Sequence, residues 1–175
     1  MPTPHERLPW ELLEPVFGSV NDEERAAVMA AFSVATLNPG EPWVRENDPS
    51  SALGVVTRGQ LSVSVFTPRG PFEVKRIGPG DVLGEVALFD PGPASATVTA
   101  LEACEVASLE FVELEVLRER YPRVAATATR ELCRRMCNRL RSVNDTSWRD
   151  KPSSARAKQG SFWSVFQRWF GGSDE

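Results

Sequence analysis

The feature that most constrains the fold is the dense series of turn signals between residues 33 and 110. Proline and glycine recur there every few residues, in "NPGEP", "ENDPSS", "TRGQ", "TPRGP", "GPGD" and "DPGP". These residues interrupt regular structure, because proline removes a backbone donor and glycine readily adopts positive φ. The intervening segments are too short to hold a helix that crosses between parallel strands. The spacing therefore predicts roughly eight short strands in an antiparallel roll or sandwich.

The segments between the turns show the alternation of half-buried strands. In "QLSVSVF" the apolar residues Leu61, Val63 and Val65 alternate with serines. The segments "FEVKRI", "ASATVTA" and "CEVASLEF" behave similarly. In a strand, successive side chains point to opposite faces of the sheet, so residues of one kind recur at every second position. We therefore expect the alternating valines to form the core.

Helical patterns flank the predicted strands. "SVNDEERAAVMAAF" predicts a helix with Ser19 or Asn21 as its N-cap and acidic residues in its first turn. "VELEVLRERY" predicts a second helix that stops at Tyr121, because the next residue is a proline. A third helix is expected roughly from Pro122 to Thr146, with the proline in its first turn. The predicted fold class is mainly β, a jelly-roll-like β-roll with an N-terminal helix, two C-terminal helices and a short tail helix.

The third predicted helix carries an apolar stripe surrounded by arginines. The members of the stripe are Leu132, Met136, Leu140 and Val143. The stripe has two interpretations, packing on its own roll or pairing with the same helix of a second copy in a homodimer. The arginines are interpreted as a solvated face. Cys133 and Cys137, four residues apart on this helix, are interpreted as small packing residues.

Cysteine and histidine usage indicates neither a disulfide framework nor a metal site. The chain has three cysteines, an odd number, and a single histidine, His5. No His/Cys ligand set can be assembled from these residues, so no metal is expected. The N-terminus lacks a basic region followed by an apolar one, and no stretch is apolar enough to span a membrane. The sequence thus predicts a cytoplasmic protein.

Charge and composition change toward the C-terminus. Residues 1–115 carry a net charge of −11, whereas residues 116–175 carry +7. We expect an N-terminal segment (1–18), a β-roll domain with its C-terminal helices (19–147), a polar linker (148–160) and a tail helix (161–172). The tail sequence "SFWSVFQRWFGG" predicts an amphipathic helix.

The aromatic face of the tail is the second informative feature of the chain. It consists of Phe162, Trp163, Phe166, Trp169 and Phe170. Exposed aromatic patches rarely stay uncovered, so this face favours docking onto a protein partner first and self-docking second. Contact with a membrane surface ranks third, because one short helix with few basic residues binds a membrane weakly. If the tail contacts a membrane surface, the protein is expected to be cytoplasmic and peripheral at that membrane.

The sequence does not favour catalysis or DNA reading. It contains no G-x-S-x-G elbow, Walker loop or HExxH motif, and no cluster of acid, base and nucleophile around a histidine. Fewer than 30 residues follow Thr146, which is less than a winged helix-turn-helix needs. We predict a protein that is not an enzyme and does not bind DNA.

Residues 84–100, "GEVALFDPGPASATVTA", combine a Gly-Glu opening, an apolar run and a Pro/Gly-rich loop. A helical turn that starts at Gly84 would direct free backbone N–H groups at an anion. Glu85 would repel a phosphate directly, so its carboxylate suits the hydroxyls of a ribose beside the phosphate. The alternatives are that Glu85 is a surface acid favoured by the helix dipole, and that Ser95 is only an alternating strand residue.

Over about residues 14–146 the sequence resembles the cyclic nucleotide-binding domains of protein kinase A regulatory subunits, nucleotide-gated channels and catabolite-activator transcription factors. The resemblance rests on "NPGEPWVREND", "LGVVTRGQLSVSV", "RIGPGDVLGEVALF" and "ASATVTALEACEVASL", in the family's order and followed by two helices. It implies a β-roll that senses a ligand and does not catalyse. The family's phosphate-binding cassette reads Gly-Glu-x-Ala-Leu and then Pro-Arg-Ala-Ala-Thr-Val-x-Ala. Here the corresponding segments are "GEVAL" and "PASATVTA".

The resemblance assigns candidate ligand-binding roles to seven residues. The ribose-contacting glutamate falls on Glu85, and the small or hydroxyl residue that follows the family's arginine falls on Ser95. The remaining positions are Gly84, Val86 and Ala87 in the turn, and Ala94 and Ala96 in the second half of the cassette.

The family's arginine falls on Ala94. A charge-assisted contact contributes about 1.5–3 kcal/mol, so cAMP or cGMP is expected to bind with low affinity if it binds. No resident cofactor is expected. Basic residues elsewhere are candidates for the missing charge, and besides the arginines of the C-terminal helices they are Arg58, Arg69, Lys75 and Arg76.

Two hypotheses for the function follow. The first is a sensor whose ligand, bound in the cassette, biases the C-terminal helices and so acts on a partner or a dimer. The second is a degenerate domain without ligand, which acts as an interaction or localisation scaffold through its long helix and aromatic tail.

Overall fold

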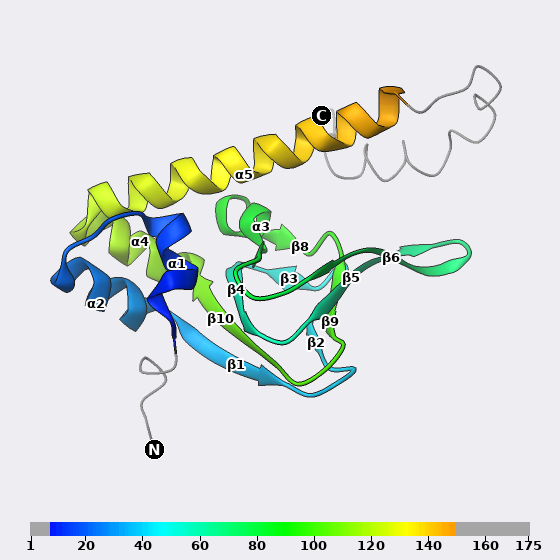
Figure 1. Cartoon of the computed structure of the whole chain (residues 1–175), viewed down its shortest axis with the longest axis horizontal. Coiled ribbons are helices and arrows are strands. Elements are labelled where there is room, and N and C mark those ends of the chain that lie inside the picture. The colour runs from blue at the N-terminus through cyan, green and yellow to red at the C-terminus, as the bar shows by residue number, and fades with distance from the viewer. Residues whose placement is uncertain (1–7, 150–175) are drawn as a thin grey trace. The chain divides into compact units, whose positions relative to one another are not determined.

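The computed structural model describes residues 8–149, which form five helices and ten strands (Figure 1). The helices are α1 (Trp10–Phe17), α2 (Asp22–Ala31), α3 (Glu85–Phe89), α4 (Phe111–Arg120) and α5 (Pro122–Arg149). The strands are β1 (Ser33–Leu37), β2 (Pro42–Val44), β3 (Pro49–Ser50), β4 (Ala52–Arg58), β5 (Leu61–Thr67), β6 (Gly70–Ile77), β7 (Val82–Leu83), β8 (Gly92–Pro93), β9 (Thr97–Ala100) and β10 (Cys104–Glu110).

All of the strand pairs are antiparallel, which confirms the predicted β-roll. One four-stranded sheet has the order β1-β10-β4-β7, the other has the order β2-β9-β5-β6, and β3 pairs with β8. In β5, Leu61 and Val65 are buried as predicted, but Val63 between them is only partly buried, like Ser62 and Ser64. The alternation predicted for "FEVKRI" is wrong, because residues 71–76 of β6 are all exposed, Val74 among them. Valines of β4, β9 and β10 complete the interior of the roll.

A second core lies where the N-terminal helices meet α4 and the start of α5. It includes Leu13 and Phe17 of α1, Val28 of α2, Leu117 of α4 and Val124 of α5. Figure 1 shows α1, α2 and α4 gathered where β1 begins and β10 ends. Helices α1, α2 and α4 therefore lie at one end of the β1-β10-β4-β7 sheet.

Helix α1 was not expected from the sequence, which indicated only an N-terminal segment over residues 1–18. The helix has eight residues, starts after Pro9 without a side-chain cap and contains Pro15. None of these features marks a helix in a sequence. Burial of Leu13, Val16 and Phe17 on the core stabilises it instead.

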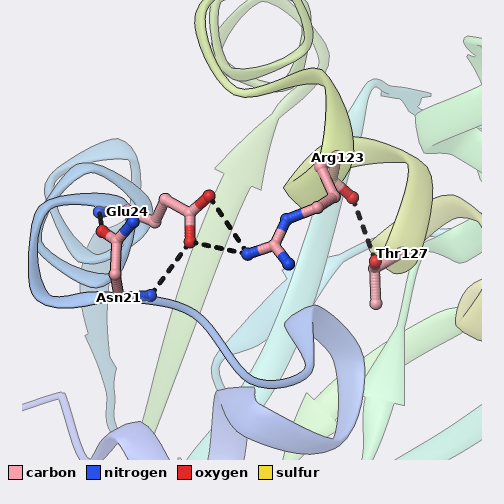
Figure 2. Close-up of polar contacts among 4 residues, drawn as sticks. All are labelled: Asn21, Glu24, Arg123 and Thr127. Carbon is pink, nitrogen blue, oxygen red and sulfur yellow. Dashed lines mark hydrogen bonds and ion pairs between the residues drawn. The ribbon is translucent and has the colours of Figure 1, made fainter.

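Asn21, and not Ser19, is the N-cap of α2. The Asn21 side chain accepts a hydrogen bond from the backbone N–H of Glu24, and the Glu24 carboxylate accepts one from the N–H of Asn21, both at 2.9 Å (Figure 2). The same carboxylate pairs with Arg123 of α5 (Figure 2). The Tyr121 hydroxyl donates a hydrogen bond to Glu23 at 2.9 Å. The start of α2 is thus tied to the corner between α4 and α5.

The two C-terminal helices start and stop close to where the sequence indicated. Helix α4 ends at Arg120, Tyr121 lies at the corner, and α5 begins at Pro122. Helix α5 extends to Arg149, three residues beyond the predicted end.

The prediction of a homodimer through the apolar stripe of α5 is wrong at Leu132, the first residue of the stripe. Leu132 is 1% exposed and belongs to the core of its own chain, so it is not available to a second copy. Met136 and Leu140 are partly buried, and the side chain of Val143 lies outside the described residues. The packing prediction for Cys133 and Cys137 is wrong, because both are exposed. Arginines 130, 134, 139 and 141 are exposed, as expected of a solvated face, and Arg135 is partly buried.

Several sequence predictions concern residues that the structure does not describe. His5, the linker beyond Arg149 and the tail helix predicted over residues 161–172 lie outside the described residues, and so do all five aromatic residues of its face. The division into four segments stays a prediction. Within residues 8–149, no helix has the length and apolar character needed to cross a membrane.

Candidate functional site

Gly84 sets the path of the first half of the cassette. It follows β7, has a left-handed backbone with φ of 73°, and precedes α3. A Cβ atom at this position would overlap the carbonyl oxygen of Ala52 at the start of β4. Positive φ and this close approach both require glycine. The Gly-Glu opening of the cassette is therefore dictated by backbone geometry at its first residue.

Glu85 is buried at the start of α3, with 4% of its surface exposed. The interpretation of Glu85 as a surface acid is therefore wrong. An isolated buried carboxylate is costly unless it has hydrogen-bond partners. Among residues 8–141, every buried side-chain oxygen and nitrogen has such a partner. Helix α3 buries the side chains of Glu85 and Leu88 and exposes those of Val86 and Phe89.

The second half of the cassette is fixed through its backbone. Strand β8 pairs with β3, and the next residue, Ala94, continues this pairing. The N–H of Ala94 donates to the carbonyl of Asp48, and its carbonyl accepts from the N–H of Asn47, both at 2.8 Å. Asn47 adopts φ of 72°, which asparagine tolerates better than most other residues. The chain path at Ala94 therefore does not depend on its side chain.

Ser95 and Ala96 form a bend that leads into β9. Because β9 begins at Thr97, the interpretation of Ser95 as an alternating strand residue is wrong. Ser95 is exposed and Ala96 is buried. The Thr97 hydroxyl accepts a hydrogen bond from the N–H of Glu46 at 3.0 Å, which ties the start of β9 to the loop before β3.

Both halves of the cassette lie against the same stretch of chain, residues 47–54. Gly84 packs on Ala52, Leu83 pairs with Gly54, and Ala94 bonds with Asn47 and Asp48. The sequence indicated a turn over residues 46–51 but assigned residues 47–54 no part in the site. The segment "REND" (residues 45–48) could have pointed to this stretch, because it combines an asparagine, which tolerates positive φ, with an acidic residue on each side.

Trp43 fills the space beside the two glycines of this region. Its indole N–H donates to the Ser108 hydroxyl at 3.2 Å. Its ring lies 3.0 Å from the place that a Cβ would take at Gly54, and 3.3 Å from the corresponding place at Gly84. The tryptophan and the two glycines are therefore matched in shape.

The cassette itself, residues 84–97, supplies backbone amides, buried Glu85 and exposed Asp90, but no basic side chain. Among the basic residues considered as substitutes, Arg76 forms an ion pair with Glu73 within β6 at 2.8 Å. Arg69 lies in the turn between β5 and β6, and Arg58 is the last residue of β4, at the opposite end from Ala52. The structure thus brings two of the seven predicted residues, Gly84 and Ala94, against one framework, residues 47–54.

The sequence model of the cyclic nucleotide-binding domain matches residues 34–121, half of the chain. The chain belongs to the cyclic nucleotide-binding domain family. Members of this family are regulatory domains, and they occur both in transcriptional regulators and in the regulatory subunits of protein kinases.

Several relatives of known name share the domain. The CRP-like cAMP-activated global transcriptional regulator of Mycobacterium tuberculosis is 25% identical over 145 residues, which cover 82% of this chain and 64% of the regulator. The chain therefore spans less than two thirds of that relative's length. The N-terminal domain of a transcriptional regulator from Streptomyces coelicolor is 36% identical, with a TM-score of 0.64 over 75% of this chain and 91% of that one.

The cyclic nucleotide-binding domain is also similar to a ligand-bound structure. The regulatory domain of Toxoplasma gondii protein kinase A, crystallised with cAMP, is 28% identical, with a TM-score of 0.59 over 72% of this chain and 46% of that one. The resemblance noted from the sequence is therefore confirmed at the level of family and fold.

Proposed function

We propose that the protein is a non-catalytic regulatory module that senses a cyclic nucleotide in the cassette of residues 84–97. The observation that carries this proposal is the burial of Glu85 in the first turn of α3. An acidic side chain that is solvated has no need of a buried position, whereas a carboxylate sheltered from water is a suitable hydrogen-bond acceptor for sugar hydroxyls. The cAMP named in several relatives supports the ligand class.

Six of the seven candidate residues have a stated role in this proposal. The Glu85 carboxylate accepts hydrogen bonds from the ribose, and the backbone of Gly84, Val86 and Ala87 faces the phosphate. Ser95 offers a hydroxyl at the exposed bend. Because Ala94 carries no charge, the affinity for cAMP or cGMP is low, about 10- to 150-fold below that of a site with an arginine.

The output of the module is a change at its C-terminal helices. Helices α4 and α5 meet at the corner that α2 holds through Glu23 and Glu24. A ligand shifts the populations of two arrangements only if it binds one of them better. The receiver in this proposal is an effector protein in the cytoplasm, which the aromatic face of the predicted tail contacts.

One observation favours the second candidate, a scaffold without ligand. The backbone bonds of Ala94 fix the loop through main-chain atoms of the protein itself, and the cassette carries no basic side chain to neutralise a phosphate. In such a scaffold, Glu85 serves only the packing of α3 on β4.

Thermal unfolding with cAMP, cGMP and cyclic dinucleotides up to the millimolar range separates the two candidates. A ligand at a hundred times its dissociation constant adds about 2.7 kcal/mol, which raises the melting temperature by several degrees. The sensor predicts a saturable shift with one nucleotide, loss of the shift in Glu85→Gln and tighter binding in Ala94→Arg. Glu102→Gln, at an exposed carboxyl outside the cassette, is the matched control. Absence of any shift, in the natural chain and in Ala94→Arg alike, would leave the scaffold.

A further inference from the structure

Strand β6 has an open edge. It is the outermost strand of the sheet β2-β9-β5-β6, and among the described residues no other strand pairs with its outer side. Residues 71–76 are all exposed. In Figure 1 the turn that joins β5 to β6 stands clear of the other strands. An open edge presents backbone donors and acceptors to another chain.

This edge also exposes bulky apolar side chains. Phe72 is 61% exposed and Val74 is 55% exposed, more than most apolar residues of the described chain. Natural edge strands are usually protected by charges or by bulges. Strand β6 has both features. It carries the charged residues Glu73, Lys75 and Arg76. Its register against β5 shifts between Val63 and Ser64, which leaves Val74 as an additional residue in a bulge. These features restrict which strands can pair with β6.

The charges of β6 are distributed over its two faces by the bulge. Ser62 of β5 donates to the Glu73 carboxylate at 2.7 Å, and Arg76 pairs with the same carboxylate at 2.8 Å. These three side chains share the face that is turned away from buried Leu61 and Val65. Lys75 lies opposite Val63, a residue that packs against the buried cluster, and so belongs to the other face.

We propose that β6 pairs with β6 of a second copy of this chain, in antiparallel orientation about a two-fold axis between Val74 and Lys75. In this register Glu73 lies opposite Arg76 of the partner subunit, and the reverse contact is identical by symmetry. Each Glu73 then has its own Arg76 along the strand and Arg76 of the partner subunit across it, and each Arg76 likewise has two glutamates as neighbours. Phe72 is covered by the end of the partner's strand.

Charge selects this register over its neighbours. A shift of the axis onto Val74 places Glu73 opposite the partner's Lys75, and the bulge has turned these two side chains to different faces. A shift of the axis onto Lys75 places two lysines opposite each other, which is unfavourable. The occupant is therefore a second copy, since the strand is complementary to itself in one register.

Sedimentation velocity of the full chain over a wide concentration range tests the proposal. The natural chain is expected to form dimers as concentration rises, and added salt is expected to weaken them. Arg76→Glu carries glutamate at both positions and Glu73→Arg carries arginine at both. Each variant alone is expected to dimerise at least about tenfold more weakly. An equimolar mixture of the two variants is expected to form a heterodimer, because every cross-strand pair is then of opposite sign.

The control is Arg118→Glu, which reverses one charge of the exposed Glu115–Arg118 pair on α4 and is expected to leave dimerisation unchanged. Thermal melts establish that each variant is folded. A natural chain that stays monomeric up to millimolar concentration overturns the proposal. Dimers that persist in both single variants, or a mixture that stays monomeric, also overturn it and would direct attention to Met136 and Leu140 of α5.

Discussion

Glu24 on α2 forms an ion pair with Arg123 on α5, with 3.2 Å between a carboxylate oxygen and a guanidinium nitrogen, although the two residues are 99 positions apart. The same carboxylate closes the capping box with Asn21, so one side chain both starts a helix and joins it to another (Figure 2). The N-terminal helices are thereby connected to the corner where α4 meets α5.

The two contacts of Glu24 are expected to differ in strength. Asn21→Ala removes the side-chain acceptor of the N-cap and should lower the free energy of unfolding by about 1 kcal/mol. Arg123→Ala should cost less than about 1 kcal/mol, because its side chain is 74% exposed and water screens the pair. Urea denaturation of the two variants measures both values. A larger loss in Arg123→Ala would show that the interhelical contact, not the cap, dominates here.

Gly84→Ala should destabilise the fold far more than a left-handed backbone alone explains. Gly40 provides the comparison, because it has a similar φ of 82° and no atom within 4 Å of the place that a Cβ would take. Gly40→Ala should cost about 1–2 kcal/mol for its backbone conformation. Gly84→Ala should exceed this, since its Cβ also meets the carbonyl of Ala52. Equal losses in thermal or urea unfolding would contradict the close approach.

Tyr121 is the only tyrosine of the chain, so phenolate absorbance titrates it directly. The hydrogen bond that it donates to Glu23 raises the pKa of its phenol above the ordinary value. Glu23→Ala should lower this pKa toward about 10, whereas Glu113→Ala, at an exposed acid of α4, should not change it. A phenol pKa that is the same in Glu23→Ala and in the natural chain would disprove the contact.

The same bond makes stability depend on pH at the alkaline end. The folded-state pKa lies above the unfolded one, so the stabilisation is complete below the unfolded pKa of about 10 and is lost as pH rises through the folded pKa. Tyr121→Phe should therefore be less stable than the natural chain at neutral pH, and the difference should shrink in alkali.

The two faces of α3 should respond differently to truncation. Leu88 is fully buried, and Leu88→Ala should cost about 2–5 kcal/mol through the cavity that it leaves. Val86 on the other face is 42% exposed, and Val86→Ala should change stability by about 0.5 kcal/mol or less. Chemical denaturation of the two variants measures the contrast, and comparable losses would mean that α3 is oriented differently.

The sequence predicted the roll because turn residues and alternation are local signals. "QLSVSVF" alternates between polar and apolar residues from Gln60 to Val65, and Pro122 marks the corner between α4 and α5 without reference to any other residue. Helix α1 could not be predicted in this way, since its stability comes from contacts of Leu13 and Phe17 with distant residues. The extra residue in β6, Val74, likewise depends on pairing with β5 and has no local signal.

For the cassette, the sequence located the residues but not their surroundings. The position of Glu85 followed from the motif, whereas its burial depends on the packing of α3 against β4. The hydrogen bonds between Ala94 and residues 47–48 join parts of the chain more than forty positions apart. The same limitation explains why both local interpretations, of Glu85 as a surface acid and of Ser95 as a strand residue, were wrong.

The backbone bonds of Ala94 separate two properties that a binding loop usually combines. The path of the loop is set by main-chain atoms of Asn47 and Asp48, while in the proposed function the charge offered to a ligand is set by the side chain at position 94. A lineage can therefore lose or regain an arginine here in one substitution, with no need to rebuild the loop around it. Under the proposed function, such a substitution would change whether regulation depends on a ligand while the architecture stays the same.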